Sequence, residues 1–222
     1  MSPGSLLLGQ QGAQFSCSHE HGRGDRCIAF YFDESWIEDL AYQIPGVRSI
    51  RIAHVRIPPA QSLAPLIADV QAFVDGQDTG GSEELALRVA AAALAPHANE
   101  RPPSRAATPA EERRIAAVLK NLNEEIAEPL SLARLAAAAG MNRYHFLRVF
   151  QRVTGQTPWR FILSRRLALA ARNLTMGPGT VLDAAVASGF SDLSEFTRQF
   201  RRYFGVTPGV YSRRESRSTA PE

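Results

Sequence analysis

The segment FLRVFQRVTGQTP, residues 146–158, returns fifty residues later as FTRQFRRYFGVTP, residues 196–208. Both copies space two phenylalanines by four residues, carry arginines between and after them, and end in Gly-x-Thr-Pro. The matched positions are Phe146 and Phe196, Arg148 and Arg198, Phe150 and Phe200, Arg152 and Arg202, Gly155 and Gly205, and Thr157-Pro158 and Thr207-Pro208. The recurrence of one basic, aromatic segment predicts a duplicated structural unit.

Each copy is preceded by a short, alanine-rich segment that ends on glycine, LARLAAAAG (132–140) and VLDAAVASG (181–189). The longer segments that follow, 142–155 and 191–205, open on Asn, Ser and Asp, which cap helix N-termini. Small side chains let two helices cross closely, and glycine permits a tight turn between them. This layout is typical of a helix-turn-helix, whose second helix can enter the major groove of DNA.

Helical spacing separates an inner from an outer face in both longer helices. The predicted core stripes, at intervals of three and four residues, are Phe146, Val149, Phe150 and Val153 in the first helix and Leu193, Phe196, Phe200 and Phe204 in the second. The predicted outward residues are Arg143, Tyr144, Leu147, Arg148 and Gln151 in the first helix and Ser194, Glu195, Arg198, Gln199, Arg201 and Arg202 in the second.

The outward residues suit two kinds of DNA contact. An arginine can donate two hydrogen bonds to guanine O6 and N7, which discriminates by about 1–3 kcal/mol, and Arg148 and Arg198 occupy fitting positions. Glu195 could accept from a cytosine amino group, or it is simply a favourable charge near a helix N-terminus. The expected phosphate contacts are Arg143, Gln151, Gln199, Arg201 and Arg202, of which the last two equally suit solvated charges.

A single long helix, predicted over residues 157–177, joins the two units. About 19 residues at about 1.5 Å each extend roughly 28 Å. Successive major grooves on one face of B-DNA lie about 34 Å apart. One chain is therefore predicted to read two successive grooves with the helices at 142–154 and 192–204, which most helix-turn-helix proteins accomplish as dimers.

Residues 111–214 resemble the DNA-binding domain of the AraC/XylS family of bacterial transcription regulators. The resemblance is most specific in AAVASGFSDLSEFTRQFRRYFGVTPGVYSRR, residues 184–214. It implies transcription activation, often through contact with RNA polymerase, and a thymine-methyl contact for Leu147, where family members often carry a polar residue. By position, the base-reading residues that the resemblance implies are Tyr144, Leu147, Arg148, Ser194, Glu195 and Arg198.

Charge is distributed unevenly along the 222 residues, whose net charge is +3. Residues 1–110 hold 8 Arg or Lys and 12 Asp or Glu, whereas residues 111–214 hold 16 and 8. A basic half joined to an acidic half favours a polyanionic partner such as double-stranded DNA, although this arginine-rich composition could also reflect coding bias. No apolar run is long enough to cross a membrane and the start lacks a signal peptide, so we expect a cytoplasmic protein.

The expected fold class is α+β, with a partial or reduced cupin-like β region ahead of the all-α double helix-turn-helix domain. Residues 5–57 carry alternating and β-branched stretches, SLLLG, AQFSCSH, RCIAFYF and VRSIRIAHVRI, broken by Gly and Pro. Two amphipathic helices follow at 64–76 and 82–98, which suit dimerisation or packing on the β region. The expected divisions are 1–60 (β sensor), 61–98 (helical pair), 99–110 (linker), 111–214 (DNA-binding domain) and 215–222 (tail).

The sequence CSHEHGRGDRC contains Cys17, His19, His21 and Cys27. A strand would place Cys17, His19 and His21 on one face, and two thiolates with two imidazoles suit tetrahedral zinc or another divalent metal. The alternatives are a hairpin with no ligand and a redox pair. The competing function is therefore a small cupin-type metalloprotein or a metal or redox sensor, and the effector of a regulator could be a small molecule or a metal. No nucleophile–base pair or paired carboxylates accompany the cluster, so no catalytic residue is assigned and no enzyme is expected.

Overall fold

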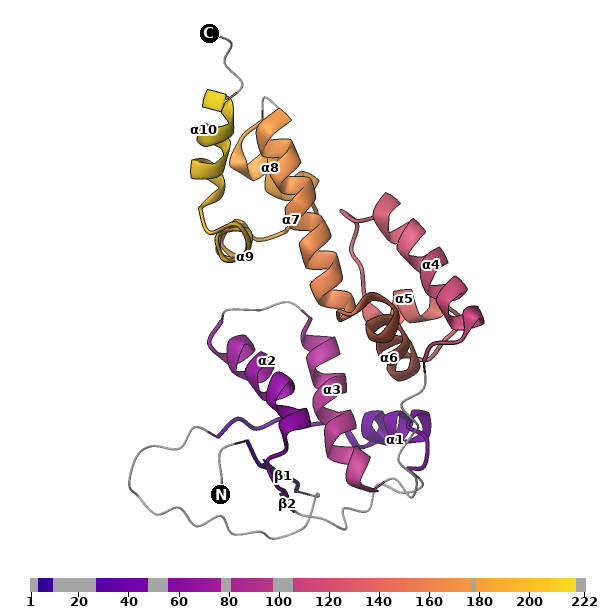
Figure 1. The fold of residues 1–222 in the computed structure, drawn as a ribbon. Helices are drawn as coiled ribbons and strands as arrows, with labels where there is room; N and C mark the ends of the chain where they lie inside the picture. Colours follow the sequence, from indigo (N-terminus) through magenta and orange to yellow (C-terminus); the bar gives the residue numbers. More distant parts are fainter. Residues whose placement is uncertain are drawn as a thin grey trace, which may run out of the picture. The chain divides into compact units, whose positions relative to one another are not determined.

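The computed structural model describes residues 4–9, 27–47, 56–76, 81–97, 106–176 and 179–218 (Figure 1). The chain divides into two compact units. The first contains residues 1–72 and 82–105, and the second contains residues 73–81 and 106–222. No helix in the described ranges is both long enough and apolar enough to span a bilayer.

The first unit combines a minimal hairpin with helices. Strands β1 (Leu6–Leu7) and β2 (Arg56–Ile57) pair antiparallel, with Leu6 opposite Ile57. Helix α1 (Glu34–Gln43) packs against α3 (Ser82–Leu94), and Arg88 of α3 forms a 2.8 Å ion pair with Asp69 of α2 (Ala64–Val74). The helical elements are α1 (Glu34–Gln43), η1 (Gln61–Leu63), α2 (Ala64–Val74), α3 (Ser82–Leu94) and η2 (Ala95–His97).

The expected cupin-like β region is not confirmed, because β1 and β2 are the only strands among the described residues. The strand predicted over 26–32 is wrong for residues 27–32, and helix α1 follows it unpredicted. Asp33 caps α1 by accepting from the Ser35 backbone amide at 3.0 Å, and Phe32 stacks on Trp36 at 5.2 Å. The cap and the aromatic contact explain why this apolar stretch leads into a helix. The predicted strand AQFSCSH lies outside the described residues.

The second unit is all-helical in its described residues, as predicted. Its helices are α4 (Pro109–Glu124), α5 (Leu132–Ala138), α6 (Arg143–Thr154), α7 (Pro158–Met176), α8 (Val181–Ala187), α9 (Leu193–Phe204) and α10 (Pro208–Ser218). Pairs α5–α6 and α8–α9 are the two helix-turn-helix copies, and α7 joins them (Figure 1). Helix α4 begins inside the predicted linker because Thr108 and Glu111 form a capping box.

Each copy is built on a phenylalanine pair. Phe146 and Phe150 have ring centroids 5.4 Å apart, as have Phe196 and Phe200, and all four side chains are fully buried. Phe200 also packs in a buried cluster with Leu167 and Ala170 of α7. The repeated aromatic positions are therefore core, as the spacing predicts. Two other members of the predicted core stripes, Val153 and Leu193, are exposed instead.

Candidate nucleic-acid interface

Helix α9 is fixed at both ends and along its inner face. Asp192 caps it by accepting from the Glu195 backbone amide at 2.8 Å, and Gly205 ends it in the left-handed region at φ 77°. Glycine adopts this backbone region without the steric cost that a Cβ carries. With Phe196 and Phe200 buried, the opposite face of α9 is held toward solvent.

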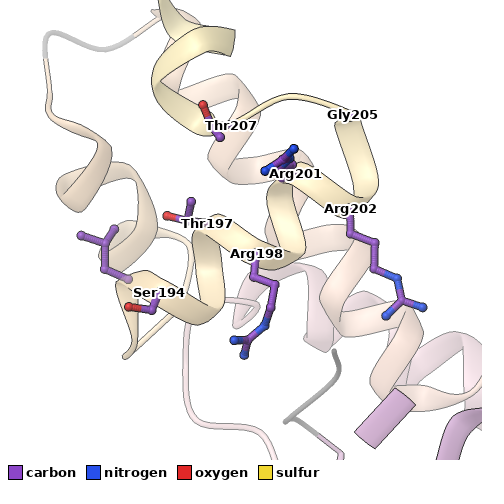
Figure 2. Close-up of a pocket in the computed structure, with 8 residues that line it drawn as sticks. Ser194, Thr197, Arg198, Arg201, Arg202, Gly205 and Thr207 are labelled. Atoms are coloured by element: carbon purple, nitrogen blue, oxygen red, sulfur yellow. The ribbon is translucent and has the colours of Figure 1, made fainter. Parts of the chain in front are cut away.

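An open groove runs along this exposed face and the turn that follows it (Figure 2). Three arginines and two threonines supply most of its hydrogen-bonding groups. Thr197 was not among the predicted site residues, and Thr207 was noted only as a repeated position that follows Gly205. The residues that line the groove are Leu193, Ser194, Thr197, Arg198, Arg201, Arg202, Gly205 and Thr207.

The charges on α9 are coupled to one another. Arg198 forms an ion pair with the carboxylate of Glu195, one turn earlier. Gln199 donates from Nε2 to Glu195 Oε1 at 2.8 Å and is only 3% exposed, so its predicted outward position is wrong. Helix α9 contacts α7, α8 and α10, and these three neighbours bury a wider face than the phenylalanine stripe alone. Arg201 and Arg202 are exposed, as predicted.

Helix α6 presents a related surface with different chemistry. Asn142 caps it by accepting from the His145 backbone amide at 2.8 Å. The guanidinium of Arg148 lies over the ring of Tyr144, with Cζ 5.6 Å from the ring centroid. Leu147 is only 4% exposed, so its predicted outward position is wrong. The physical reason is again packing on several sides, because α6 contacts α4, α5 and α7.

The remaining predicted residues of α6 flank this surface. Gln151 is exposed and Arg143 is partly exposed. A feature that the sequence analysis missed is the pair between His145 Nε2 and Glu111 Oε1, at 3.3 Å. His145 is the repeat equivalent of Glu195, fifty residues on. The two copies therefore share the guanidinium of Arg148 and Arg198 and differ in the groups beside it.

The predicted metal ligands Cys17, His19 and His21 lie outside the described residues. Cys27 is described, and its thiol is free and exposed. Elsewhere in the described ranges, no three His, Cys, Asp or Glu side chains gather in a way that could hold a metal ion. The proposed zinc site therefore remains a prediction from sequence.

Comparisons with known proteins match the helical unit. Residues 135–214 match a family model described as a helix-turn-helix domain. Regulatory protein SoxS of Salmonella typhimurium is 34% identical over 100 residues, which cover 45% of this chain and 94% of SoxS. Right origin-binding protein of Escherichia coli is 37% identical over 92 residues, 41% of this chain but only 32% of that relative. The solved DNA-binding domain of AdpA, in complex with a target DNA, aligns with 29% identity and a TM-score of 0.46, covering 48% of this chain and 98% of that one.

The duplicated helix-turn-helix, together with an alignment that covers 94% of SoxS, places this chain in a class of DNA-binding proteins. The chain belongs to the AraC/XylS family of transcription regulators, as its sequence pattern indicates.

Proposed function

We propose that this chain is a sequence-specific transcription regulator that reads two successive major grooves of B-DNA with α6 and α9. The observation that carries the proposal is the duplication of one 12-residue helix, capped by Asn142 or Asp192 and bearing a guanidinium on its exposed side. The 19 residues of α7 extend about 28 Å, which is close to the roughly 34 Å between successive grooves.

Within this proposal, Arg148 and Arg198 read guanine, since a guanidinium can donate two hydrogen bonds to one guanine edge. Tyr144 and Ser194 complete the reading surfaces, and Glu195 acts through Arg198. Leu147 and Gln199 are left out of the contact set because both are buried. The proposed phosphate contacts are Arg143, Gln151, Arg201 and Arg202, whose charges or amides attract the DNA backbone without reading sequence.

Family membership supports a proposal for the wider role. We propose that the protein activates transcription by contact with RNA polymerase, and that the unit formed by residues 1–72 and 82–105 responds to a small-molecule or metal effector. The pair α2–α3 is the proposed dimerisation element. Light scattering over a range of concentrations tests the dimer, and a constant monomer mass at the highest concentration contradicts it.

The experiment that tests DNA recognition is selection from fragmented genomic DNA of the host organism by the purified full chain. We expect enrichment of fragments that share a two-part motif. The double variant Arg148→Ala/Arg198→Ala should lose that enrichment, whereas Lys120→Gln, an exposed charge change on α4, should keep it. Folded wild-type protein that enriches no sequence contradicts the proposal.

A further inference from the structure

One arginine in the middle of α7 binds three backbone carbonyls from both halves of the helical unit. Arg166 donates from Nε to Ile126 O at 2.9 Å and from Nη2 to Glu128 O at 2.8 Å. It also donates from Nη1 to Gly189 O at 2.8 Å. Ile126 and Glu128 belong to the loop between α4 and α5, whereas Gly189 belongs to the turn between α8 and α9. A single guanidinium therefore connects the loop that leads into the first copy with the turn inside the second copy.

The environment of Arg166 indicates a built contact. Its guanidinium is partly buried, and this burial lowers its pKa by removing water from the charged form. Hydrogen bonds from a charged donor are stronger than neutral ones and offset the lost hydration. The planar fork of arginine can bind several acceptors in fixed directions, which the single ammonium of lysine cannot reproduce.

The backbone geometry at Gly189 shows how closely the two copies approach. A Cβ added there would lie 2.7 Å from Ala127 O and 2.9 Å from Ala127 Cα, closer than side chains ordinarily come. The equivalent turn residue of the first copy, Gly140, has nothing within 4 Å of such an atom. The tight approach is therefore a contact between this turn and the loop before α5, and not a general requirement of the turn.

We propose that Arg166 is a positioning residue that fixes the orientation of α9 relative to α6, and so the spacing between half-sites that the protein accepts. This inference rests on the proposed function. Helix α7 sets the distance between the copies, and the second copy packs on α7 through the buried cluster that contains Leu167, Ala170 and Phe200. The three carbonyl contacts add a direct link across the unit, because they hold the turn that leads into α9 against the loop that leads into α5.

The test measures binding to duplexes in which one base pair is added to or removed from the segment between the two half-sites. A duplex with altered spacing must be bent or twisted before both half-sites can contact the protein, and this deformation costs free energy. The wild type should therefore bind the native spacing about tenfold or more tightly than the altered ones. In Arg166→Gln this preference should fall to about threefold or less, and Arg166→Lys should lie between them, because lysine keeps the charge but not the fork. Arg172→Gln, an exposed arginine on the same helix, should keep the wild-type preference.

A second measurement needs no DNA. Spin labels at Gln151→Cys and Arg201→Cys, the repeat-equivalent exposed positions of α6 and α9, report the distance between the helices once Cys17 and Cys27 are replaced by serine. The distance distribution should broaden in Arg166→Gln and stay unchanged in Arg172→Gln. Circular dichroism verifies folding, and Arg166→Lys carries the test where Arg166→Gln does not fold.

The outcomes separate the two proposals. If Arg166→Gln keeps the spacing preference of the wild type and its distance distribution does not broaden, the positioning role is overturned. An equal loss of affinity at every spacing in Arg166→Gln also overturns it. Absence of half-site binding by wild type instead defeats the proposed function, and the distance measurement then decides the role of Arg166 by itself.

Discussion

Arg198 forms an ion pair with Glu195 on the exposed side of α9, and Glu195 also accepts a hydrogen bond from buried Gln199. In α6 the equivalent arginine, Arg148, lies over the ring of Tyr144. Both guanidinium groups are thus held by a neighbour on their own helix, one through charge and one through a ring face. Such preorganisation lowers the side-chain entropy that is lost when a contact forms.

Glu195→Gln should reduce discrimination at the base pair that Arg198 reads, and should raise affinity for unrelated DNA. The loss of discrimination should be below about fivefold, because exposed ion pairs contribute about 0.2–1 kcal/mol. The affinity for unrelated DNA should rise because a negative charge is removed near the phosphates. Fluorescence anisotropy on matched and unrelated duplexes measures both, with His145→Gln as the control at the equivalent position of α6. If Glu195→Gln changes preference at a different base pair, Glu195 is itself a base reader.

Arg148→Ala and Arg198→Ala should each cost about 1–3 kcal/mol of binding to the best site and relax specificity at one base pair. The two affected base pairs should lie about 10 base pairs apart, because the helices occupy successive turns of one face. Binding to a panel of single-base substitutions measures the positions. Equal loss across every duplex would show that the arginines contact phosphates only.

Arg201→Gln and Arg202→Gln should each lower the slope of log affinity against log salt concentration by about 0.9, the value for one phosphate contact. Specificity should be unchanged, since phosphates carry no sequence information. Titrations between about 50 and 200 mM salt measure the slope. Lys120→Gln removes one exposed charge from α4 and serves as the control. Unchanged slopes in the two arginine variants would mean that Arg201 and Arg202 are solvated charges that do not contact phosphates.

Gly140→Ala and Gly189→Ala should separate backbone strain from steric contact. Both glycines have positive φ, 61° and 83°, so alanine should cost about 1–2 kcal/mol at either position. Gly189→Ala should cost about 1–3 kcal/mol more, because its Cβ would press on the Ala127 backbone. Denaturant unfolding measures the difference. Equal destabilisation by both variants would mean that the contact with Ala127 relaxes freely.

Asp183 should give the second helix-turn-helix an acid-sensitive contribution to stability. Its carboxylate accepts from the Thr180 backbone amide at 2.8 Å and from the Thr180 hydroxyl at 2.7 Å, and these bonds lower its pKa below the ordinary 3.8. A lowered folded-state pKa stabilises the fold above 3.8, and this contribution is lost as the pH falls through the folded-state pKa. The difference in melting temperature between wild type and Asp183→Asn should therefore shrink on acidification. A difference that is independent of pH would contradict this role.

The helical unit could be predicted from sequence because its signals are local. Caps such as Asn142 and Asp192, terminal glycines and phenylalanines spaced by four residues fix each helix within its own segment. The same periodicity predicted the outward positions of Arg148, which is partly exposed, and of Arg198, which is exposed. It failed at Leu147 and Gln199, since their burial depends on three neighbouring helices and not on spacing within one helix.

Two further features were not predicted, for different reasons. Helix α1 starts at a local cap, Asp33, which was overlooked because the apolar, strand-like stretch RCIAFYF directly precedes it. The carbonyl partners of Arg166 are 23 to 40 residues away in the chain. No local pattern distinguishes Arg166 from its neighbour Arg165, which lies over the Phe161 ring instead. Long-range backbone contacts become visible only in the folded chain.

The most direct test of the central claim is a hydroxyl-radical footprint of the full chain on its best selected DNA fragment. We predict two protected segments about one helical turn apart on one face of the duplex, made by a single protein molecule per site. Arg148→Ala should weaken protection of one segment, and Arg198→Ala that of the other. A single protected segment, or two segments that appear only when two protein molecules bind, would contradict the proposal that one chain reads both grooves.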